Sequence, residues 1–247
     1  MALPGNNIPR LFLNTGIEYK LIVQFVKELA EKDNRFVFVQ PSQNIKDMLE
    51  EYGYPFKSKD HAQKVAVYQR NGMTKTPSDY IGLTGNKGKT WLCPDKLKYQ
   101  FTPEFKLKVS DKCCFKLKKE PAEKWAKENN RPISITGIRG AEGGLRRSMQ
   151  GCTTFSGDEL HKFHPLFPLT DDWLEEFIKR NNIELCKLYY EPYNFERTGC
   201  KGCGFNPKLQ QQLNIMKELL PDEYKQCELI WKPVYDEYRR VGYRLKD

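Results

Sequence analysis

The sequence predicts a mixed α/β protein built on a parallel sheet, and three features near its start support this prediction. Residues 9–13 read as a short apolar strand, residues 18–32 place apolar side chains at helical spacing, and residues 36–39 form a second apolar run. Strand, helix and strand in this order are the unit of a parallel sheet, which binds ligands at the carboxyl ends of its strands. The turn Asn14-Thr15-Gly16 after the first strand is therefore a candidate binding position.

Later elements follow from the same periodicities. Helices are predicted over residues 44–52, 61–69, 113–128, 209–220 and 224–240, and a buried strand over residues 132–136. Thr170 is expected to cap a further helix whose apolar face carries Trp173, Leu174, Phe177 and Ile178. Residues 72–112 are interrupted by glycine and proline and rich in lysine, so we interpret them as a basic insertion. The lone His61 is expected to be exposed or capping and not a ligand, and His161 and His164, without a partner at metal-ligand spacing, are expected at the surface.

The charge and cysteine content narrow the class of protein. The 247 residues contain 41 Lys and Arg against 32 Asp and Glu, a net charge of +9. Such a balance favours anionic partners, namely nucleotides, sulfate or phosphate esters, or nucleic acid. No apolar run approaches the roughly 20 residues that span a bilayer. Eight cysteines without an export signal indicate a reducing compartment and metal or redox chemistry, so the sequence predicts a cytoplasmic protein without a membrane partner.

Four of the cysteines form the strongest motif: the adjacent pair Cys113-Cys114, and Cys200 and Cys203 in a glycine-rich Cys-x-x-Cys turn. A cubane iron–sulfur cluster takes four thiolates and is large enough to be reached by two neighbouring cysteines. A tetrahedral zinc ion also takes four thiolates, usually from two Cys-x-x-Cys-like turns. Ordinary buried cysteines, or a redox dithiol at 200 and 203, are further alternatives.

A second motif follows the predicted strand 132–136. Gly137-Ile138-Arg139-Gly140-Ala141-Glu142-Gly143-Gly144-Leu145-Arg146-Arg147 combines glycines, which let the backbone approach a ligand, with guanidinium groups, which bind phosphate or sulfate oxygens. The segment is therefore a candidate anion site, with a solvated basic loop as the alternative.

The spacing of the cysteines resembles a known family. Cys-Cys, a gap of 86 positions (200 − 114) and Cys-x-x-Cys resemble the cluster signature of the iron–sulfur adenylyl-sulfate reductases. These belong to the wider phosphoadenosine phosphosulfate reductase family of adenine nucleotide alpha-hydrolase-like proteins. The turn at Thr15-Gly16 and the segment Thr136-Gly137-Ile138-Arg139 also resemble segments of that family, and the resemblance covers roughly residues 10 to 215.

The resemblance implies a three-layer α/β/α parallel sheet over residues 1–205, with the basic insertion at about 72–112, and a helical C-terminal section over residues 206–247. It implies a 4Fe–4S cluster on Cys113, Cys114, Cys200 and Cys203, with zinc as the alternative metal. It also implies an adenine nucleotide or sulfonucleotide held by Thr15, Gly16, Arg139, Glu142 and Arg146.

The function that the resemblance implies is redox or sulfur-transfer chemistry on an adenylated or sulfated nucleotide, with a possible electron donor protein as partner. Two alternatives remain open: a nucleic-acid-linked sulfur-transfer or modification protein, and a non-catalytic metal-stabilised binding module. The net charge and the basic residues 72–119 motivate the first of these.

The sequence departs from the family pattern in two places. Only about ten residues precede Leu11, too few for the strand and phosphate loop that open the family's sheet, so we expect an N-terminally truncated version of the fold. The family's nucleophilic cysteine near the C-terminus has no counterpart after Cys227, so no catalytic residue is assigned.

Overall fold

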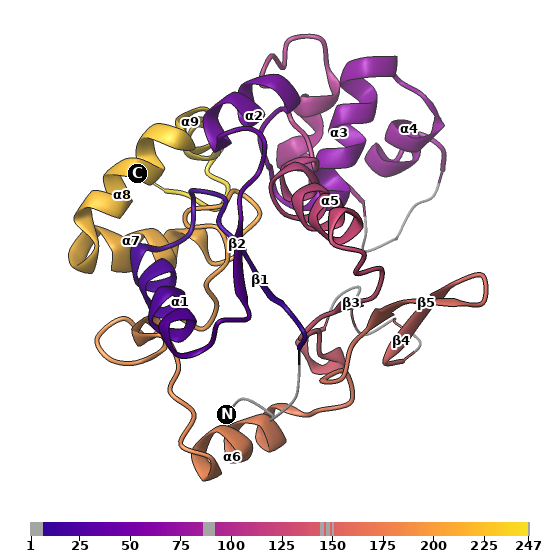
Figure 1. Ribbon diagram of the computed structural model, residues 1–247. Coiled ribbons are helices and arrows are strands. Elements are labelled where there is room, and N and C mark those ends of the chain that lie inside the picture. Colours follow the sequence, from indigo (N-terminus) through magenta and orange to yellow (C-terminus); the bar gives the residue numbers. More distant parts are fainter. Residues whose placement is uncertain (1–6, 86–91, 144–145, 147–148, 150, 247) are drawn as a thin grey trace. The chain divides into compact units, whose positions relative to one another are not determined.

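The computed structural model describes residues 7–85, 92–143, 146, 149 and 151–246 (Figure 1). Residues 86–91 of the basic insertion fall outside this range, and so do parts of the predicted anion loop.

The elements follow in this order: β1 (Arg10–Leu13), α1 (Lys20–Lys32), β2 (Phe36–Val39), α2 (Ile45–Tyr52), α3 (Lys59–Asn71), α4 (Lys75–Ile81), the 3₁₀ helix η1 (Asp95–Phe101), the π-helix η2 (Phe115–Lys119), α5 (Glu120–Glu128), β3 (Ser134–Ile135), the 3₁₀ helix η3 (Gly140–Glu142), β4 (Thr153–Ser156), β5 (Glu159–Phe163), α6 (Asp171–Arg180), the 3₁₀ helix η5 (Lys187–Tyr189), α7 (Leu209–Leu219), α8 (Pro221–Ile230) and α9 (Lys232–Arg240). None of the helices in the described ranges is long and apolar enough to cross a membrane.

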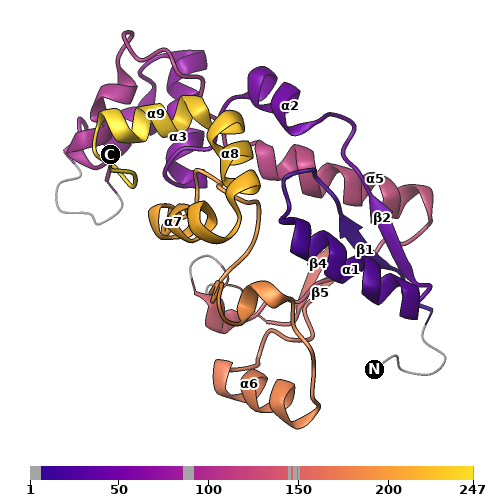
Figure 2. The same cartoon turned by 90° about the vertical axis from the view of Figure 1, so that its left-hand side faces the viewer.

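The chain forms two compact units, one made of residues 1–122 and 187–247 and the other of residues 123–186. In the first unit, β1 and β2 pair in parallel with Arg10 opposite Phe36 and Leu13 opposite Val39. Helix α1 connects the two strands and lies beside them in both views (Figures 1 and 2). The predicted strand–helix–strand unit is therefore confirmed, and its carboxyl end carries the Asn14-Thr15-Gly16 turn.

The core of the first unit is rich in aromatic side chains, many of them from the last three helices. Trp231, between α8 and α9, and Tyr235 and Tyr238 of α9 are almost fully buried. The ring of Tyr238 lies 4.3 Å from that of Phe56, and Tyr19, Leu188, Leu209 and Met216 are buried in the same unit. Because α7–α9 lie in the same compact unit as β1 and β2, residues 206–247 share a core with the start of the chain. The domain boundary at residues 205/206 stays a prediction.

The basic insertion contains helical structure, α4 and η1, which packs on a buried histidine of α3. His61 is fully buried, and its ring nitrogens lie 3.0 Å from the Tyr80 hydroxyl and 2.7 Å from the Gln100 amide oxygen. The expectation of an exposed His61 was wrong. Its two hydrogen-bond partners lie 19 and 39 residues further along the chain, beyond the reach of a local pattern.

The second unit holds a small mixed sheet in the order β3-β5-β4, with β3 parallel and β4 antiparallel to β5. The prediction of a buried strand over residues 132–136 was wrong. The strand found there, β3, spans only two residues, and both are exposed. It pairs on one side only, with β5, so it is an edge strand. His164, expected at the surface, is buried beneath this sheet's end, where Nδ1 lies 2.6 Å from the Thr136 hydroxyl.

The mixed α/β character of the prediction is confirmed, whereas a single three-layer sheet is not what the described strands form. They form two small sheets, of two and three strands. The continuous parallel sheet and its N-terminal truncation remain predictions.

Candidate functional site

Cys113 and Cys114 lie at the start of a continuous helical segment that runs through η2 into α5. The first turns are π-helical, a geometry that is rare and often found at functional sites. Cys113 is buried and Cys114 half-buried. A local helix therefore positions this pair, as the sequence predicts.

The pKa values of the two neighbouring thiols are shifted in opposite directions. The hydrogen bond from the Cys113 thiol, together with the positive charges of Lys59 and Lys118, lowers the pKa of Cys114 against the effect of burial. The same hydrogen bond and burial raise the pKa of Cys113, and the negative charges of Cys200 and Cys203 add to this. Cys114 is thus the thiol of this pair that is more readily ionised.

Cys200 and Cys203 lie on a tight turn in which the Cys203 amide donates to the Cys200 carbonyl at 3.3 Å. Gly199 and Gly202 adopt positive φ values of 93° and 65°, a conformation that glycine takes without strain. The Lys201 amide donates to the Ile17 carbonyl at 2.9 Å, so the turn is tied to the segment between β1 and α1. Burial raises the pKa of both thiols, that of Cys203 to about 12.

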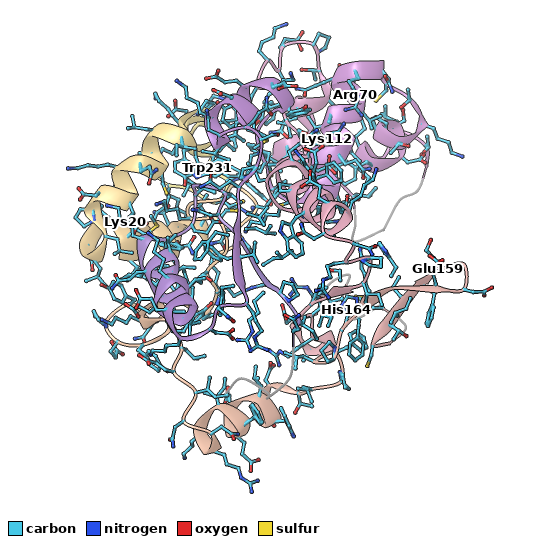
Figure 3. All side chains as sticks on the ribbon, in the orientation of Figure 1. Lys20, Arg70, Lys112, Glu159, His164 and Trp231 are labelled. Atoms are coloured by element: carbon cyan, nitrogen blue, oxygen red, sulfur yellow. The ribbon has the colours of Figure 1, made fainter. Side chains whose placement is uncertain are left out.

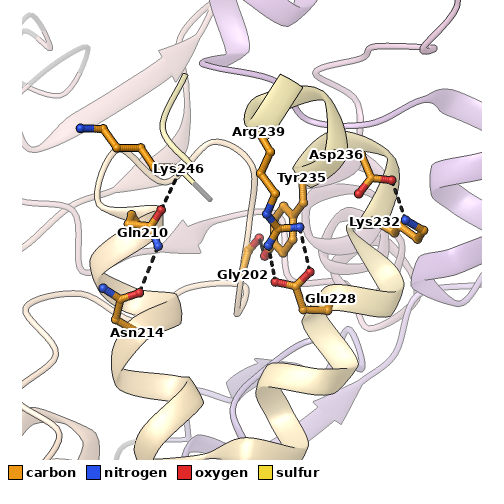
Figure 4. Close-up of polar contacts among 9 residues, drawn as sticks. All are labelled: Gly202, Gln210, Asn214, Glu228, Lys232, Tyr235, Asp236, Arg239 and Lys246. Atoms are coloured by element: carbon orange, nitrogen blue, oxygen red, sulfur yellow. Dashed lines mark hydrogen bonds and ion pairs between the residues drawn. The ribbon is translucent and has the colours of Figure 1, made fainter. Parts of the chain in front are cut away.

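The C-terminal helices hold this cysteine turn by its carbonyl groups. The Trp231 indole donates to the Lys201 carbonyl at 3.0 Å. The Tyr235 hydroxyl donates to the Gly202 carbonyl at 2.5 Å, and Figure 4 shows these two residues. Tyr238 and Arg244 both donate to the Gly204 carbonyl, at 2.6 and 2.7 Å. Because these donors are buried or half-buried, the turn is fixed from outside its own segment.

A buried ion pair completes this support. Lys201 and Glu223 are 2% and 3% exposed, and the Lys201 Nζ lies 2.8 Å from the Glu223 carboxylate. The same carboxylate accepts the Lys20 amide at 3.2 Å. A charge buried this deeply requires its partner, because its desolvation would otherwise be uncompensated.

Lys118 connects the four cysteines to the turn after β1. Burial works to lower the pKa of Lys118, but the negative charges of Cys200 and Glu18 outweigh it, and the pKa is raised. Its Nζ lies 3.6 Å from the Glu18 carboxylate. Glu18 in turn accepts hydrogen bonds from the Thr15 amide at 2.8 Å and from the Thr15 hydroxyl. Thr15, Glu18, Lys118 and Cys200 thus form one polar chain that runs from the buried Thr15 and Glu18 to the half-buried Lys118 and Cys200.

Together, these contacts place the four cysteines in one unit, with their charges acting on one another. The pKa of Cys203, for example, is raised first by burial and then by the charges of Cys200 and Cys114. Within the described ranges, no three His, Cys, Asp or Glu side chains are arranged around a single metal ion. The donor set is chemically that of a four-thiolate cluster or ion.

A pocket of about 420 Å³ opens beside the same turn. Gly16 lines it, while Thr15 is buried behind it and directed at Glu18. Three lysines line it as well: Lys20, Lys27 and Lys201. Since Lys201 is paired with Glu223, the exposed ammonium groups of Lys20 and Lys27 are the ones available to an anion.

The predicted anion-binding residues Arg139, Glu142 and Arg146 lie in the second unit. Arg139 NH1 lies 2.7 Å from the Asp171 carboxylate, within ion-pair distance but without hydrogen-bond geometry. Arg146 forms an ion pair with Glu142. Both arginines are therefore engaged by carboxylates that a bound anion would have to displace. Gly144, Leu145 and Arg147 lie outside the described residues.

Several site residues were not singled out from the sequence. Lys118 follows Cys114 by four positions, one helical turn, and this spacing could have identified it. Glu18 follows Thr15 by three positions, the spacing of a capping box. The support from Glu223, Trp231 and Tyr235 comes from residues 20 to 35 positions away from the cysteine turn and has no local signature.

Residues 92–206 match the family model described as the phosphoadenosine phosphosulfate reductase domain. No curated protein matches the chain. The matched segment, somewhat under half of the 247 residues, contains all four cysteines together with Arg139, Glu142 and Arg146. It does not extend to Thr15 and Gly16.

Proposed function

We propose that the chain carries an iron–sulfur cluster and performs redox or sulfur-transfer chemistry on an adenylated or sulfated nucleotide, as the match of residues 92–206 to the phosphoadenosine phosphosulfate reductase domain suggests. The observation that supports this most directly is that Cys113, Cys114, Cys200 and Cys203 lie in one unit beside the half-buried cation Lys118. Zinc on the same four thiolates is the alternative metal.

The electrostatics support a negatively charged group at this position. Four thiolates bring more negative charge than the core of irons and sulfides cancels, so nearby cations stabilise the assembly. Lys118 is half-buried, and its positive charge acts on Cys200 and Cys114, while that of Lys59 acts on Cys114. An iron–sulfur cluster bound here would supply one-electron redox chemistry or electrostatic tuning of the site.

The residues around the cysteines have distinct roles in this proposal. Glu18 holds the Thr15 turn and keeps Lys118 oriented between that turn and Cys200. Lys20 and Lys27, at the mouth of the 420 Å³ pocket, would bind the phosphate or sulfate groups of the nucleotide. Considered by themselves, Arg139 and Arg146 of the second unit remain candidate anion-binding residues, and an anion bound there would have to displace Asp171 and Glu142.

No side chain is assigned as the nucleophile. Cys227 is fully buried against Gly202, and burial raises the pKa of its thiol to about 12. A nucleophilic thiol needs to be ionised and accessible, so Cys227 is a packing residue.

The test of the cluster is anaerobic purification followed by iron, sulfide and zinc analysis of the wild type and of Cys200→Ser. Four irons and four sulfides per chain, lost in the variant, are expected. Cys152→Ser, which removes a half-buried cysteine of the second unit, is the matched control and should leave the metal content unchanged. One zinc per chain in the wild type would mean that the four thiolates form a zinc site and not a cluster site. Wild-type protein that contains neither metal would contradict both the cluster and the zinc proposal.

The test of the nucleotide pocket is calorimetric titration with adenylyl sulfate and with ATP. Lys20→Ala combined with Lys27→Ala should weaken binding about tenfold or more, because two charge-assisted contacts are lost. Lys217→Ala combined with Lys232→Ala, exposed lysines on α7 and α9, makes the same change in net charge elsewhere. If both double variants weaken binding equally, the loss comes from the lower net charge of the protein and not from contacts of Lys20 and Lys27 with the nucleotide.

A further inference from the structure

A second pocket of about 560 Å³ lies where α2 and α3 meet residues 102–109 of the basic insertion, and its lining combines aromatic rings with cations. Tyr52, Tyr68 and Phe105 are half-buried, so part of each ring reaches the surface. No Asp or Glu lines the pocket. An anionic ligand with flat apolar parts fits this lining better than a cationic or purely apolar one.

Three exposed cations surround these rings: Arg70 near the end of α3, labelled in Figure 3, and Lys106 and Lys108 on the segment after η1. Lys106 and Lys108 donate to the carbonyl groups of Pro103 and Glu51, so neither charge is cancelled by these bonds. Arg70 has no hydrogen-bond or ion-pair partner in the described part of the chain. None of the three lies within ion-pair distance of a described carboxylate, unlike Lys98 and Lys116 of the same insertion.

The pocket walls are fixed by long-range hydrogen bonds. The Gln69 side chain donates to the Leu107 carbonyl at 2.8 Å and accepts the Val109 amide at 3.1 Å. Tyr54 pairs with Val109 in a parallel bridge, in which its amide donates to the Lys108 carbonyl at 2.8 Å. Rings and cations are thus held on walls that are preorganised before any ligand binds.

The positive charge continues beyond the pocket. Residues 96–119 contain eight lysines and two acidic residues, and they lead directly from η1 to Cys113-Cys114. A single nucleotide would neutralise only a small part of this charge. A strand with regularly spaced phosphates matches it, and aromatic rings interleaved with cations are the usual means of binding unpaired bases.

We propose that this pocket binds a single-stranded nucleic acid, with an unpaired base stacked on its aromatic rings and the flanking phosphates held by Arg70, Lys106 and Lys108. The site lies apart from the lysine-lined pocket at Gly16 and goes beyond the proposed nucleotide chemistry. Base stacking supplies affinity without sequence preference, because every base presents a flat face.

The experiment is fluorescence anisotropy with fluorescein-labelled twelve-nucleotide oligo(dT) and oligo(U) at several salt concentrations. For single strands, each phosphate contact contributes about 0.7 to the slope of log affinity against log salt. Arg70→Ala combined with Lys106→Ala should therefore reduce the slope by about 1.4 and weaken binding about tenfold or more at moderate salt. Lys217→Ala combined with Lys232→Ala is the charge-matched control and should leave the slope unchanged.

Stacking is tested separately with Phe105→Leu, which keeps an apolar side chain but removes the ring. We expect about tenfold weaker binding with an unchanged salt slope. Photocrosslinking with 5-bromodeoxyuridine oligonucleotides, followed by peptide mapping, should place the crosslink between residues 52 and 108. Circular dichroism of each variant confirms that the fold is retained.

Three results would overturn the proposal. The salt slope could fall equally in the Lys217→Ala, Lys232→Ala control variant, or the crosslinks could be confined to other segments. AMP or UMP could also displace the strand when its concentration equals that of the nucleotide units in the strand. The last result would make the ligand a free nucleotide. Cys200→Ser should bind the strand with wild-type affinity, so failure of the cluster proposal and failure of this one are distinguishable.

Discussion

The two cysteine segments of the first unit are held in place by different means. Cys113-Cys114 are carried by a helix formed from the residues that follow them, η2 and α5. The Cys200–Cys203 turn has no regular structure of its own, and residues 223–244 hold it through hydrogen bonds, an ion pair and packing. The comparison indicates that the first segment depends on local sequence and the second on the tertiary fold.

The largest expected effect is on the Cys200–Cys203 side, from Glu223→Ala. This change leaves the Lys201 ammonium buried without its partner, and removing one member of a buried pair costs about 3–5 kcal/mol. Urea denaturation measures the loss. Replacing both residues, as Lys201→Met with Glu223→Leu, should restore much of the stability, and a double variant as unstable as Glu223→Ala would show that the pair does not act in this way.

Next in size is Gly202→Ala. A Cβ at this position would lie 2.4 Å from the Tyr235 hydroxyl and 2.8 Å from the Cys227 sulfur, at a φ of 65°. We expect a loss of about 2–4 kcal/mol from overpacking and backbone strain. Gly199→Ala has a similar φ of 93° with nothing within 4 Å, so it should cost only about 1 kcal/mol. Equal losses in the two variants would mean that packing around Gly202 is not tight.

A smaller effect is expected from His61, on helix α3. The same helix carries Lys59, whose positive charge lowers the pKa of Cys114. Burial lowers the pKa of His61 to about 4, against about 6.5 in an unfolded chain. Between these values the unfolded chain takes up a proton at His61 while the folded chain does not. Stability that is present above pH 6.5 is therefore lost as the pH falls, by about 2 kcal/mol at pH 5.

Urea denaturation of wild type and His61→Gln at pH 7.5 and pH 5 measures this effect. The variant should lose less stability on acidification, whatever its stability at pH 7.5. His161→Gln, at an exposed histidine of the second unit, serves as control and should follow the wild type. An identical pH dependence in all three proteins would contradict the assignment to His61.

The smallest effect is expected within the locally formed segment, from Lys116→Ala. It removes a partly exposed ion pair with Glu120 at a spacing of four residues, measured at 2.7 Å. Such pairs contribute about 0.3–0.5 kcal/mol. A loss above about 1 kcal/mol in urea denaturation would show that this helix, too, depends on more than its local contacts.

The regular elements of the first unit could largely be predicted because their signals are periodic and local. The apolar residues of β1, α1 and β2 repeat at strand and helix spacings. In the second unit the local signal of a helix was equally clear, since Thr170 caps α6 as the pattern Thr-Asp-x-x-Trp indicates, but the strands were harder to predict. A strong apolar run at 132–136 gives only the two-residue strand β3, because an edge strand needs pairing partners that a run of residues does not specify.

The sequence by itself determined the match of residues 92–206 to the family model, the four cysteines and the spacing that relates them, because these depend on residue types at fixed intervals. Only the tertiary structure decided that Lys118 lies close to both Cys200 and Glu18, that Tyr235 and Trp231 hold the cysteine turn, and that cations and rings gather where α3 meets residues 102–109. These features join residues 20 to 100 positions apart. Burial and long-range hydrogen bonds bring them together, and neither leaves a periodic trace in the sequence.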